Sequence, residues 1–284
     1  MCASHDSNPL AQLAGIQGWL IDLDGVIYRG DQLLAGAPEF VTALREERIP
    51  FLFLTNNSSR TPAQYAERLT RMGIPAGPQD FYTSSQATAE YLARHAPPGT
   101  PIFVIGMDGI RQALEEAGFR ITSDPYEAAY CVVGYDNRIT YQDLALATRA
   151  VFAGARLIGT NPDPTLPVED GFIPGAGSIL AAVATAAGVT PLIIGKPEPT
   201  MLSLALERLG VPVERAAIVG DRLNTDVAGG LRLGLFTVLV LTGSTSRQDA
   251  EGSTVQPHLI VEDLVELLSL WKRRHNLPTT ALAE

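Results

Sequence analysis

The sequence predicts an α/β protein in which helices cover a parallel sheet. Apolar runs of strand length alternate with helical patterns along the chain, as they do in proteins of this class. Three of these runs end in polar residues, which is where ligands bind in open parallel sheets. The chain has 284 residues, of which 46% are hydrophobic and 18% charged, so it can form one large or two modest domains with full cores.

The first block of elements is predicted between residues 19 and 83. Strands are expected at 19–21, 51–54 and 81–83, with a helix over 37–47. A second helix has a clear start, because Thr61 is an N-cap, Pro62 takes the first helical position and Gln64 can complete a capping box. This alternation is typical of parallel strand pairing.

Two further blocks of alternating elements follow. Strands are expected at 102–105, 131–133, 157–158, 192–194, 217–219 and 237–241. Helices are expected at 109–117, 178–187, 200–209 and 261–274, and Gly188 ends the second of them. The sequence contains no internal repeat and no low-complexity linker, so domain limits depend on where the motifs fall.

Composition excludes several classes of protein. The net charge is -10 and no basic patch is present, which argues against nucleic-acid polymers and anionic membrane surfaces but not against a small anionic substrate. With only two cysteines, Cys2 and Cys131, we expect neither a disulfide framework nor a cysteine metal site. No run reaches the length of a membrane span, and residues 1–15 lack the pattern of a secretion signal. We therefore expect a soluble, reduced protein of the cytoplasm.

Two carboxylates follow the first strand. Asp22 and Asp24 point to the same side of an extended segment, and Gly25 lets the chain turn away. Two such charges about 4 Å apart repel by roughly 4 kcal/mol at an effective dielectric constant of about 20, so a bound cation would be favourable. Asp221, directly after the strand at 217–219, can join them. Oxygen ligands without His or Cys suit Mg²⁺.

The other polar residues at strand ends suit a phosphate group. Thr55, Asn56 and Asn57 offer a hydroxyl, two amides and several backbone N–H groups, although alone they could form an ordinary polar turn. Lys196, between a short strand and a helix, is either a point-charge partner for phosphate or a solvated loop lysine. Asp226 lies in the first turn of a helix, where it could simply complement the helix dipole.

Together these segments resemble the haloacid dehalogenase (HAD) superfamily of phosphatases. The resemblance is close to subfamily IIA, the group of NagD-like, 4-nitrophenyl phosphate and pyridoxal phosphate phosphatases. The segments that carry it are Asp22-Leu23-Asp24-Gly25-Val26, Thr55-Asn56-Asn57-Ser58, Gly195-Lys196-Pro197, Gly220-Asp221-Arg222 with Thr225-Asp226, Asn161-Pro162-Asp163-Pro164 and Pro174-Gly175-Ala176-Gly177-Ser178. Four motifs occur in the expected order, and the similarity spans about residues 15–270.

The resemblance implies a doubly wound, Rossmann-like core at 1–85 and 191–284, with an inserted α/β cap of the C2 type at 86–190. It implies homodimers joined through the cap. It also implies a Mg²⁺-dependent hydrolase of small phosphate monoesters such as sugar phosphates, nucleotides, glycerol phosphate, phosphoglycolate or 4-nitrophenyl phosphate.

The resemblance assigns roles to single residues as well. Asp22 would attack phosphorus and form an aspartyl phosphate, and Asp24 would act first as acid and then as base. Thr55 would hold the phosphoryl group, and Lys196 would neutralise charge. Asp22, Asp24, Asp221 and Asp226 would bind the metal, and Gly25, Thr55, Asn56, Asn57, Asp163 and Lys196 would contact substrate.

Substrate choice is expected to depend on the inserted domain. The segment 161–177 is the expected specificity loop, with Tyr135, Asp163 and Phe172 as further candidates. Leu166 stands where pyridoxal phosphate phosphatases tend to carry His, which weakens that assignment. The alternatives are a phosphoryl-accepting signalling protein or a phosphometabolite-binding protein without turnover, and, within the superfamily, a mutase or phosphotransferase.

Overall fold

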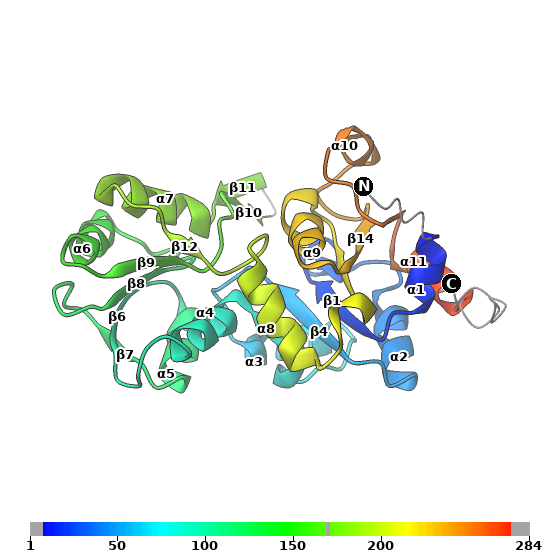
Figure 1. Ribbon diagram of the computed structural model, residues 1–284, viewed down its shortest axis with the longest axis horizontal. Coiled ribbons are helices and arrows are strands. Elements are labelled where there is room, and N and C mark those ends of the chain that lie inside the picture. The colour runs from blue at the N-terminus through cyan, green and yellow to red at the C-terminus, as the bar shows by residue number, and fades with distance from the viewer. Residues whose placement is uncertain (1–7, 169–170, 274–284) are drawn as a thin grey trace, which may run out of the picture. The chain divides into compact units, whose positions relative to one another are not determined.

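Two compact units make up the chain in the computed structural model, which describes residues 8–168 and 171–273 (Figure 1). The first unit comprises Met1–Phe53, Met72–Ile74 and Leu206–Glu284, and the second comprises Leu54–Arg71 and Pro75–Ala205. Residues 1–7, which include Cys2 and the first part of the segment 1–15, lie outside the described residues. Cys131 is buried in a strand. The predicted domain limits at 86–190 stay a prediction.

The first unit contains most of a parallel sheet. Its elements are α1 (Pro9–Ala14), β1 (Gly18–Asp22), β2 (Tyr28–Arg29), β3 (Gln32–Leu33), α2 (Ala37–Glu46), η2 (Val213–Arg215), β13 (Ala216–Gly220), η3 (Leu223–Val227), α9 (Ala228–Leu233), β14 (Phe236–Val240), α10 (Arg247–Gly252), β15 (Leu259–Val261) and α11 (Leu264–Lys272). Strand β4 (Phe51–Thr55) begins in this unit and ends in the second. The sheet has the strand order β15-β14-β13-β1-β4-β5, in which β5 (Phe81–Thr83) comes from the second unit. Because β1 lies near its middle, crossovers leave in both directions. This is the predicted doubly wound sheet.

Side-chain alternation places helices on both faces of this sheet. Trp19 lies in a T-shaped contact with Phe40 of α2 at 5.2 Å and with Trp271 of α11 at 6.1 Å. The next residue along β1, Leu20, points to the opposite face and pairs with Ile218, against which Gly230 of α9 packs. The strand therefore buries both of its faces, as parallel sheets require.

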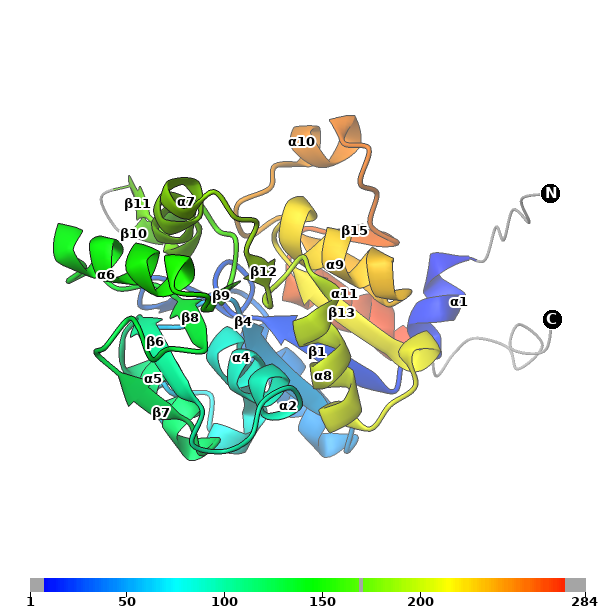
Figure 2. The same cartoon turned by 60° about the vertical axis from the view of Figure 1, so that its left-hand side comes forward.

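The second unit has a parallel sheet of its own, in the order β12-β9-β8-β6-β7. Its elements are α3 (Pro62–Arg71), η1 (Pro78–Asp80), β5 (Phe81–Thr83), α4 (Ser84–Ala93), β6 (Pro101–Ile105), α5 (Asp108–Glu116), β7 (Arg120–Thr122), β8 (Tyr130–Val133), α6 (Tyr141–Phe152), β9 (Arg156–Gly159), β10 (Thr165–Val168), β11 (Gly171–Pro174), α7 (Ala176–Ala187) and β12 (Leu192–Ile193), while α8 (Pro199–Leu209) runs across the division between the units. Helices α6 and α7 cover one face of the sheet, and α4 and α5 cover the other (Figures 1 and 2).

Most predicted elements are confirmed, and one helix begins later than predicted. The strand expected at 192–194 is β12, and it pairs with β9 of the second sheet. The helix expected at 261–274 is wrong at its start. Residues Leu259–Val261 form β15, which pairs with β14, and α11 begins only after Asp263, whose carboxylate accepts the Glu266 N–H at 2.9 Å.

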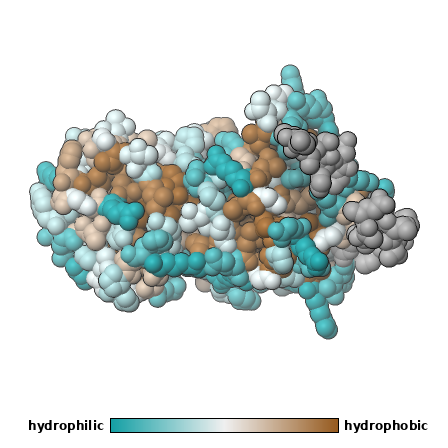
Figure 3. Space-filling view, viewed as in Figure 1, coloured by the Kyte–Doolittle hydropathy of each residue, from teal (hydrophilic) through white to brown (hydrophobic). Residues whose placement is uncertain are grey.

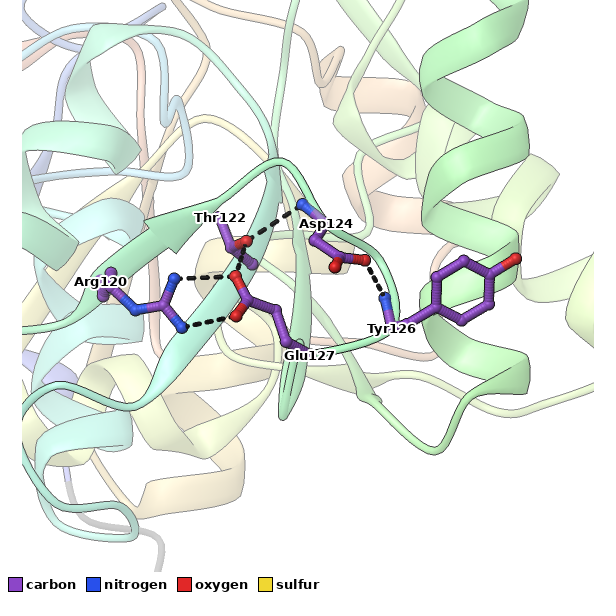
Figure 4. A network of polar contacts seen from close by, with 5 residues as sticks. All are labelled: Arg120, Thr122, Asp124, Tyr126 and Glu127. Atoms are coloured by element: carbon purple, nitrogen blue, oxygen red, sulfur yellow. Dashed lines mark hydrogen bonds and ion pairs between the residues drawn. The ribbon is translucent and has the colours of Figure 1, made fainter.

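A polar network fixes the turn that follows β7 (Figure 4). The Arg120 guanidinium donates to both carboxylate oxygens of Glu127, at 2.8 and 3.0 Å, and the Thr122 hydroxyl donates to the same carboxylate. Asp124 accepts the Tyr126 N–H at 2.9 Å. The hydrogen bond from Arg120 is the main reason why the pKa of Glu127 falls to about 2, so this carboxylate stays charged over the ordinary pH range.

We expect His258 to make the stability of the first unit depend on pH. Its Nδ1 accepts the Thr237 N–H at 3.1 Å, and partial burial lowers its pKa below the usual 6.5. The neutral ring therefore stabilises the fold fully above about pH 6.5, and this contribution is lost as the pH falls through the lower folded-state pKa. We expect the free energy of unfolding to drop as the pH falls below about 6.5, and to drop less steeply in His258→Gln.

Denaturant unfolding followed by tryptophan fluorescence measures this effect, because both tryptophans, Trp19 and Trp271, lie in the first unit. His95→Gln is the matched control, since His95 is exposed in the second unit. A pH dependence in His258→Gln as steep as that of the unsubstituted protein would contradict the assignment.

None of the helices in the described ranges has the length and apolar composition that crossing a lipid bilayer requires.

Candidate active site

Three carboxylates gather at one edge of the sheet in the first unit. Asp22 is the last residue of β1, and Asp221 directly follows β13. Because these strands are parallel neighbours in register, they end side by side. Asp226 lies on the π-helical turn Leu223–Val227, and one carboxylate oxygen from each of the three residues lies within 4.8 Å of the other two. Asp24 follows in the loop after β1 and is partly exposed.

Asp221 is the most constrained member of the cluster. The Ser244 backbone N–H donates to its Oδ2 at 2.6 Å, while its Oδ1 is buried and has no hydrogen-bond partner among the described residues. Burial raises the pKa of Asp221, and the charge of Asp226 raises it further. A buried carboxylate oxygen without a partner is costly. An all-oxygen cluster with this orphaned atom fits a hard divalent cation such as Mg²⁺.

Glycines on two loops make room for the Asp221 carboxylate. A Cβ on Gly243 would lie 2.1 Å from Oδ2 of Asp221, and a Cβ on Gly25 would lie 2.6 Å from it. Gly25 also has a φ of 83°, a conformation that other residues rarely adopt. Neither loop could approach Asp221 as closely with a larger residue.

We expect Gly243→Ala to destabilise the first unit by about 1–3 kcal/mol, because the added methyl group must displace either Asp221 or the loop backbone. Denaturant unfolding read by tryptophan fluorescence measures the loss. Gly252→Ala is the matched control, since a Cβ there meets no atom within 4 Å. Equal stability of the two variants would show that the loop relaxes without cost.

The loop after β14 is a part of the site that the sequence reasoning missed. The Arg29 guanidinium donates to the Thr242 carbonyl, and the Thr242 hydroxyl donates to the Gly25 carbonyl at 2.6 Å. The loop therefore ties the turn after β1 to Asp221 through Ser244. The same signal that pointed to Asp22 was available here, because Thr242-Gly243-Ser244 follows an apolar strand directly.

The other predicted residues belong to the second unit. Thr55, at the end of β4, is 3% exposed, and its hydroxyl accepts the Asn57 N–H at 3.1 Å. Asn57 in turn accepts the Ser59 N–H at 3.0 Å. Lys196 follows β12 and is 2% exposed, so it is no solvated loop lysine. Asn56 bonds to the Lys196 backbone and to the side chain of Asp163.

The predicted specificity loop is a hairpin in the second unit. Strands β10 and β11 pair antiparallel, with Leu166 opposite Ile173. Phe172 on β11 is 73% exposed, and the Tyr135 backbone N–H donates to Ser58 at 3.1 Å. Asp163 lies just before the hairpin, where Gly177 packs against its carbonyl. Asp163 is thus fixed between Asn56 and the start of α7.

Comparison with known proteins agrees with these observations. Residues 19–120 match a haloacid dehalogenase-like hydrolase family, and residues 193–267 match a HAD-hydrolase-like family. The chain is 41% identical over 253 residues to an acid sugar phosphatase of Staphylococcus aureus, which covers 89% of this chain and 97% of that protein.

Solved structures give the same result. A 4-nitrophenylphosphatase from Thermotoga maritima superposes with a TM-score of 0.86 and 36% identity, over 91% of this chain and 98% of that one. A glycerol phosphate phosphatase from Mycobacterium tuberculosis, in complex with magnesium, superposes with a TM-score of 0.84 and 36% identity, over 90% and 77% of the two chains. The chain therefore belongs to the haloacid dehalogenase superfamily, in the NagD-like phosphatases of subfamily IIA, and is a hydrolase of phosphoric monoesters.

Proposed function

We propose that the protein is a Mg²⁺-dependent phosphatase that hydrolyses a small phosphate monoester through an aspartyl phosphate on Asp22. The observation that carries this proposal is the carboxylate cluster of Asp22, Asp221 and Asp226 with its orphaned buried Oδ1. The cluster has the donor set of a Mg²⁺ site. The related glycerol phosphate phosphatase in complex with magnesium supports the same choice of ion.

The cation would be held by the carboxylates of Asp22 and Asp221 and by the backbone carbonyl of Asp24, with Asp226 in support. Bound there, it would offset the repulsion between a phosphate dianion and an attacking carboxylate. Burial and the neighbouring Asp226 already raise the pKa of Asp221, which is the electrostatic strain that such an ion relieves.

The residues of the chain carry the two displacements. A carboxylate oxygen of Asp22 forms the new bond to phosphorus as the bond to the leaving oxygen breaks, and Asp24 gives that oxygen a proton. In the second step Asp24 takes a proton from water as the water oxygen attacks phosphorus, which releases phosphate and restores Asp22. Using one group as acid and then as base balances the protons over the cycle.

The phosphoryl group needs donors as well as a nucleophile. We propose that its oxygens accept hydrogen bonds from the Thr55 hydroxyl and from the backbone N–H groups of Gly25, Asn56 and Asn57. The Lys196 ammonium group would neutralise the charge of the phosphoryl group. Lys196 suits this role because its ammonium group is a compact point charge for phosphate, and the side chain is buried rather than solvated.

A sugar phosphate is the substrate that we favour. The acid sugar phosphatase relative, 41% identical over nearly its whole length, supports this class, and the 4-nitrophenylphosphatase neighbour supports 4-nitrophenyl phosphate as an assay substrate. Asp163 and the β10–β11 hairpin would contact the part of the substrate beyond the phosphate. The Asp163 carboxylate can accept hydrogen bonds from the hydroxyl groups of a sugar. Leu166 has no polar group that could bind the ring of pyridoxal phosphate.

Removal of divalent ions tests the proposal. We expect hydrolysis of 4-nitrophenyl phosphate in Mg²⁺ to fall at least about a thousandfold in excess chelator, and to return when Mg²⁺ is restored, because about 4 kcal/mol of charge stabilisation is lost. The release of nitrophenolate measures it. Full turnover in chelator would refute the metal requirement, and no turnover with any phosphate monoester in Mg²⁺ would refute the activity.

We also propose that a second copy of the chain docks on the second unit. Tyr141 and Phe152, at the two ends of α6, are 86% and 70% exposed, and their spacing of eleven places them on the same helix face. Hydrophobic areas interrupt the polar surface of this unit in Figure 3. Sedimentation of Tyr141→Ser beside the unsubstituted protein tests this, and a monomer in both cases would refute it.

A further inference from the structure

The side chain of Asn56 is hydrogen-bonded to Asp163 and to the backbone of Lys196. It is 8% exposed, at the end of β4. Its amide nitrogen donates to Oδ2 of Asp163 at 3.1 Å and to the Lys196 carbonyl at 2.8 Å, and its Oδ1 accepts the Lys196 N–H at 2.9 Å. Because a backbone N–H only donates and a carbonyl only accepts, the orientation of the amide is fixed.

The backbone of Asn56 is held from the other side. Its carbonyl accepts the Ser84 hydroxyl and the Asn161 amide, both at 2.6 Å. Asn161 also accepts the Asp163 N–H at 3.0 Å. A Cβ on Gly195 would lie 2.7 Å from Oδ1 of Asn56, so the segment before Lys196 approaches as closely as glycine allows. The ends of β4, β9 and β12 thus meet at one buried amide.

We infer that Asn56 is a positioning residue that holds Lys196 and Asp163 in one fixed arrangement. Under the proposed function, on which this inference rests for its catalytic consequence, Lys196 meets the phosphoryl group and Asp163 meets the rest of the substrate. Asn56 therefore links the group that acts on phosphate to the group that acts on the substrate body. Any contact of Asn56 with phosphate is made by its backbone N–H.

Exchange of amide and carboxylate tests the link without a change of size. Asn56→Asp keeps the acceptor for the Lys196 N–H but sets a carboxylate against both the Asp163 carboxylate and the Lys196 carbonyl. Asp163→Asn alone keeps an acceptor for Asn56. In the double variant the amide introduced at position 163 can donate to the carboxylate introduced at position 56, so one hydrogen bond is regained with reversed polarity and unchanged total charge.

Kinetics of 4-nitrophenyl phosphate hydrolysis give the first readout. We expect Asn56→Asp to lower kcat about tenfold to a hundredfold with a smaller change in KM. The reason is that a displaced Lys196 binds the transition state less well, while its binding of the substrate changes less. Asp163→Asn is measured alone as the other corner of the cycle, and the double variant should recover part of the loss that Asn56→Asp causes. Asn137→Asp, the same exchange on an exposed loop of the second unit, is the control.

Hydrogen exchange of the backbone gives a readout independent of activity. We expect faster exchange of the Lys196 and Asp163 amides in Asn56→Asp, and slower exchange again in the double variant. Unaltered exchange in Asn56→Asp, or a double variant no better than the single one in both assays, would overturn the inference. An unsubstituted protein that does not hydrolyse phosphate monoesters would refute the proposed function, and the exchange comparison would still decide the role of Asn56.

Discussion

Replacing Asp22 with Asn is expected to lower kcat for phosphate monoester hydrolysis by at least about a thousandfold, because an amide cannot attack phosphorus to form the covalent intermediate. The first unit should stay folded. Asp22 is only partly buried and stands at the end of β1, after the residues that pair with β13. Loss of one charge also reduces repulsion within the cluster of Asp22, Asp221 and Asp226.

Steady-state kinetics and tryptophan fluorescence measure the two parts of this expectation. Asp31→Asn is the matched control, since Asp31 is exposed in the same unit and outside the cluster. Acid-quenched unsubstituted protein should carry a phosphoryl group on the peptide that contains Asp22, and the variant should not. A folded Asp22→Asn protein with near-normal kcat would assign the nucleophile to another residue.

Replacing Lys196 with Met is expected to lower kcat/KM by at least about a hundredfold, the range found when one charged or donor group is lost from a transition state. Methionine fills a similar volume, so the loss reports the ammonium group and not the packing. Lys196→Arg should not restore the activity, because a site that leaves the side chain 2% exposed lacks room for a planar guanidinium.

The chain offers an unusually clean control for this substitution. It contains only two lysines, and the other one, Lys272, lies exposed at the end of α11. Lys272→Met should leave both kcat and KM unchanged. Similar losses in Lys196→Met and Lys272→Met would show that the net charge of the protein, and not the Lys196 ammonium group, causes the effect. An active Lys196→Met protein would show that Lys196 has no catalytic role.

The carboxylate cluster could be predicted because its positions follow from simple periodicity. Asp22 and Asp221 each directly follow an apolar run, and parallel strands end at a common edge, so their proximity needs no other information. The helix start at Thr61 was equally readable, and the structure has both of its hydrogen bonds, at 2.8 and 3.2 Å. Local chemistry fixes such features.

Features that depend on distant partners could not be predicted in the same way. The apolar run at 192–194 predicts a strand but does not indicate which of the two sheets the strand joins. Strand β12 has only two paired residues, Leu192 and Ile193, which is too few for a pattern. The hairpin β10–β11 contains Pro167 and exposed side chains, so it lacks the pattern of a strand. The apolar stripe of α11 continues into β15, which extended the predicted helix by three residues.

Asn56 shows the same limit at a single residue. The sequence identified it as a polar residue after a strand, suited to phosphate, but could not show that its side chain is used by Lys196 and Asp163. These residues are separated from it by more than a hundred positions. Only the fold decides which polar groups at a strand end are left for a ligand.

Titration of the protein with Mg²⁺ by calorimetry tests the shared cation site most directly. We expect one saturable site, with affinity at least about tenfold weaker in Asp221→Asn at unchanged thermal stability, because that residue supplies a buried, otherwise unpartnered oxygen. Equal Mg²⁺ affinity in the two proteins would contradict the account.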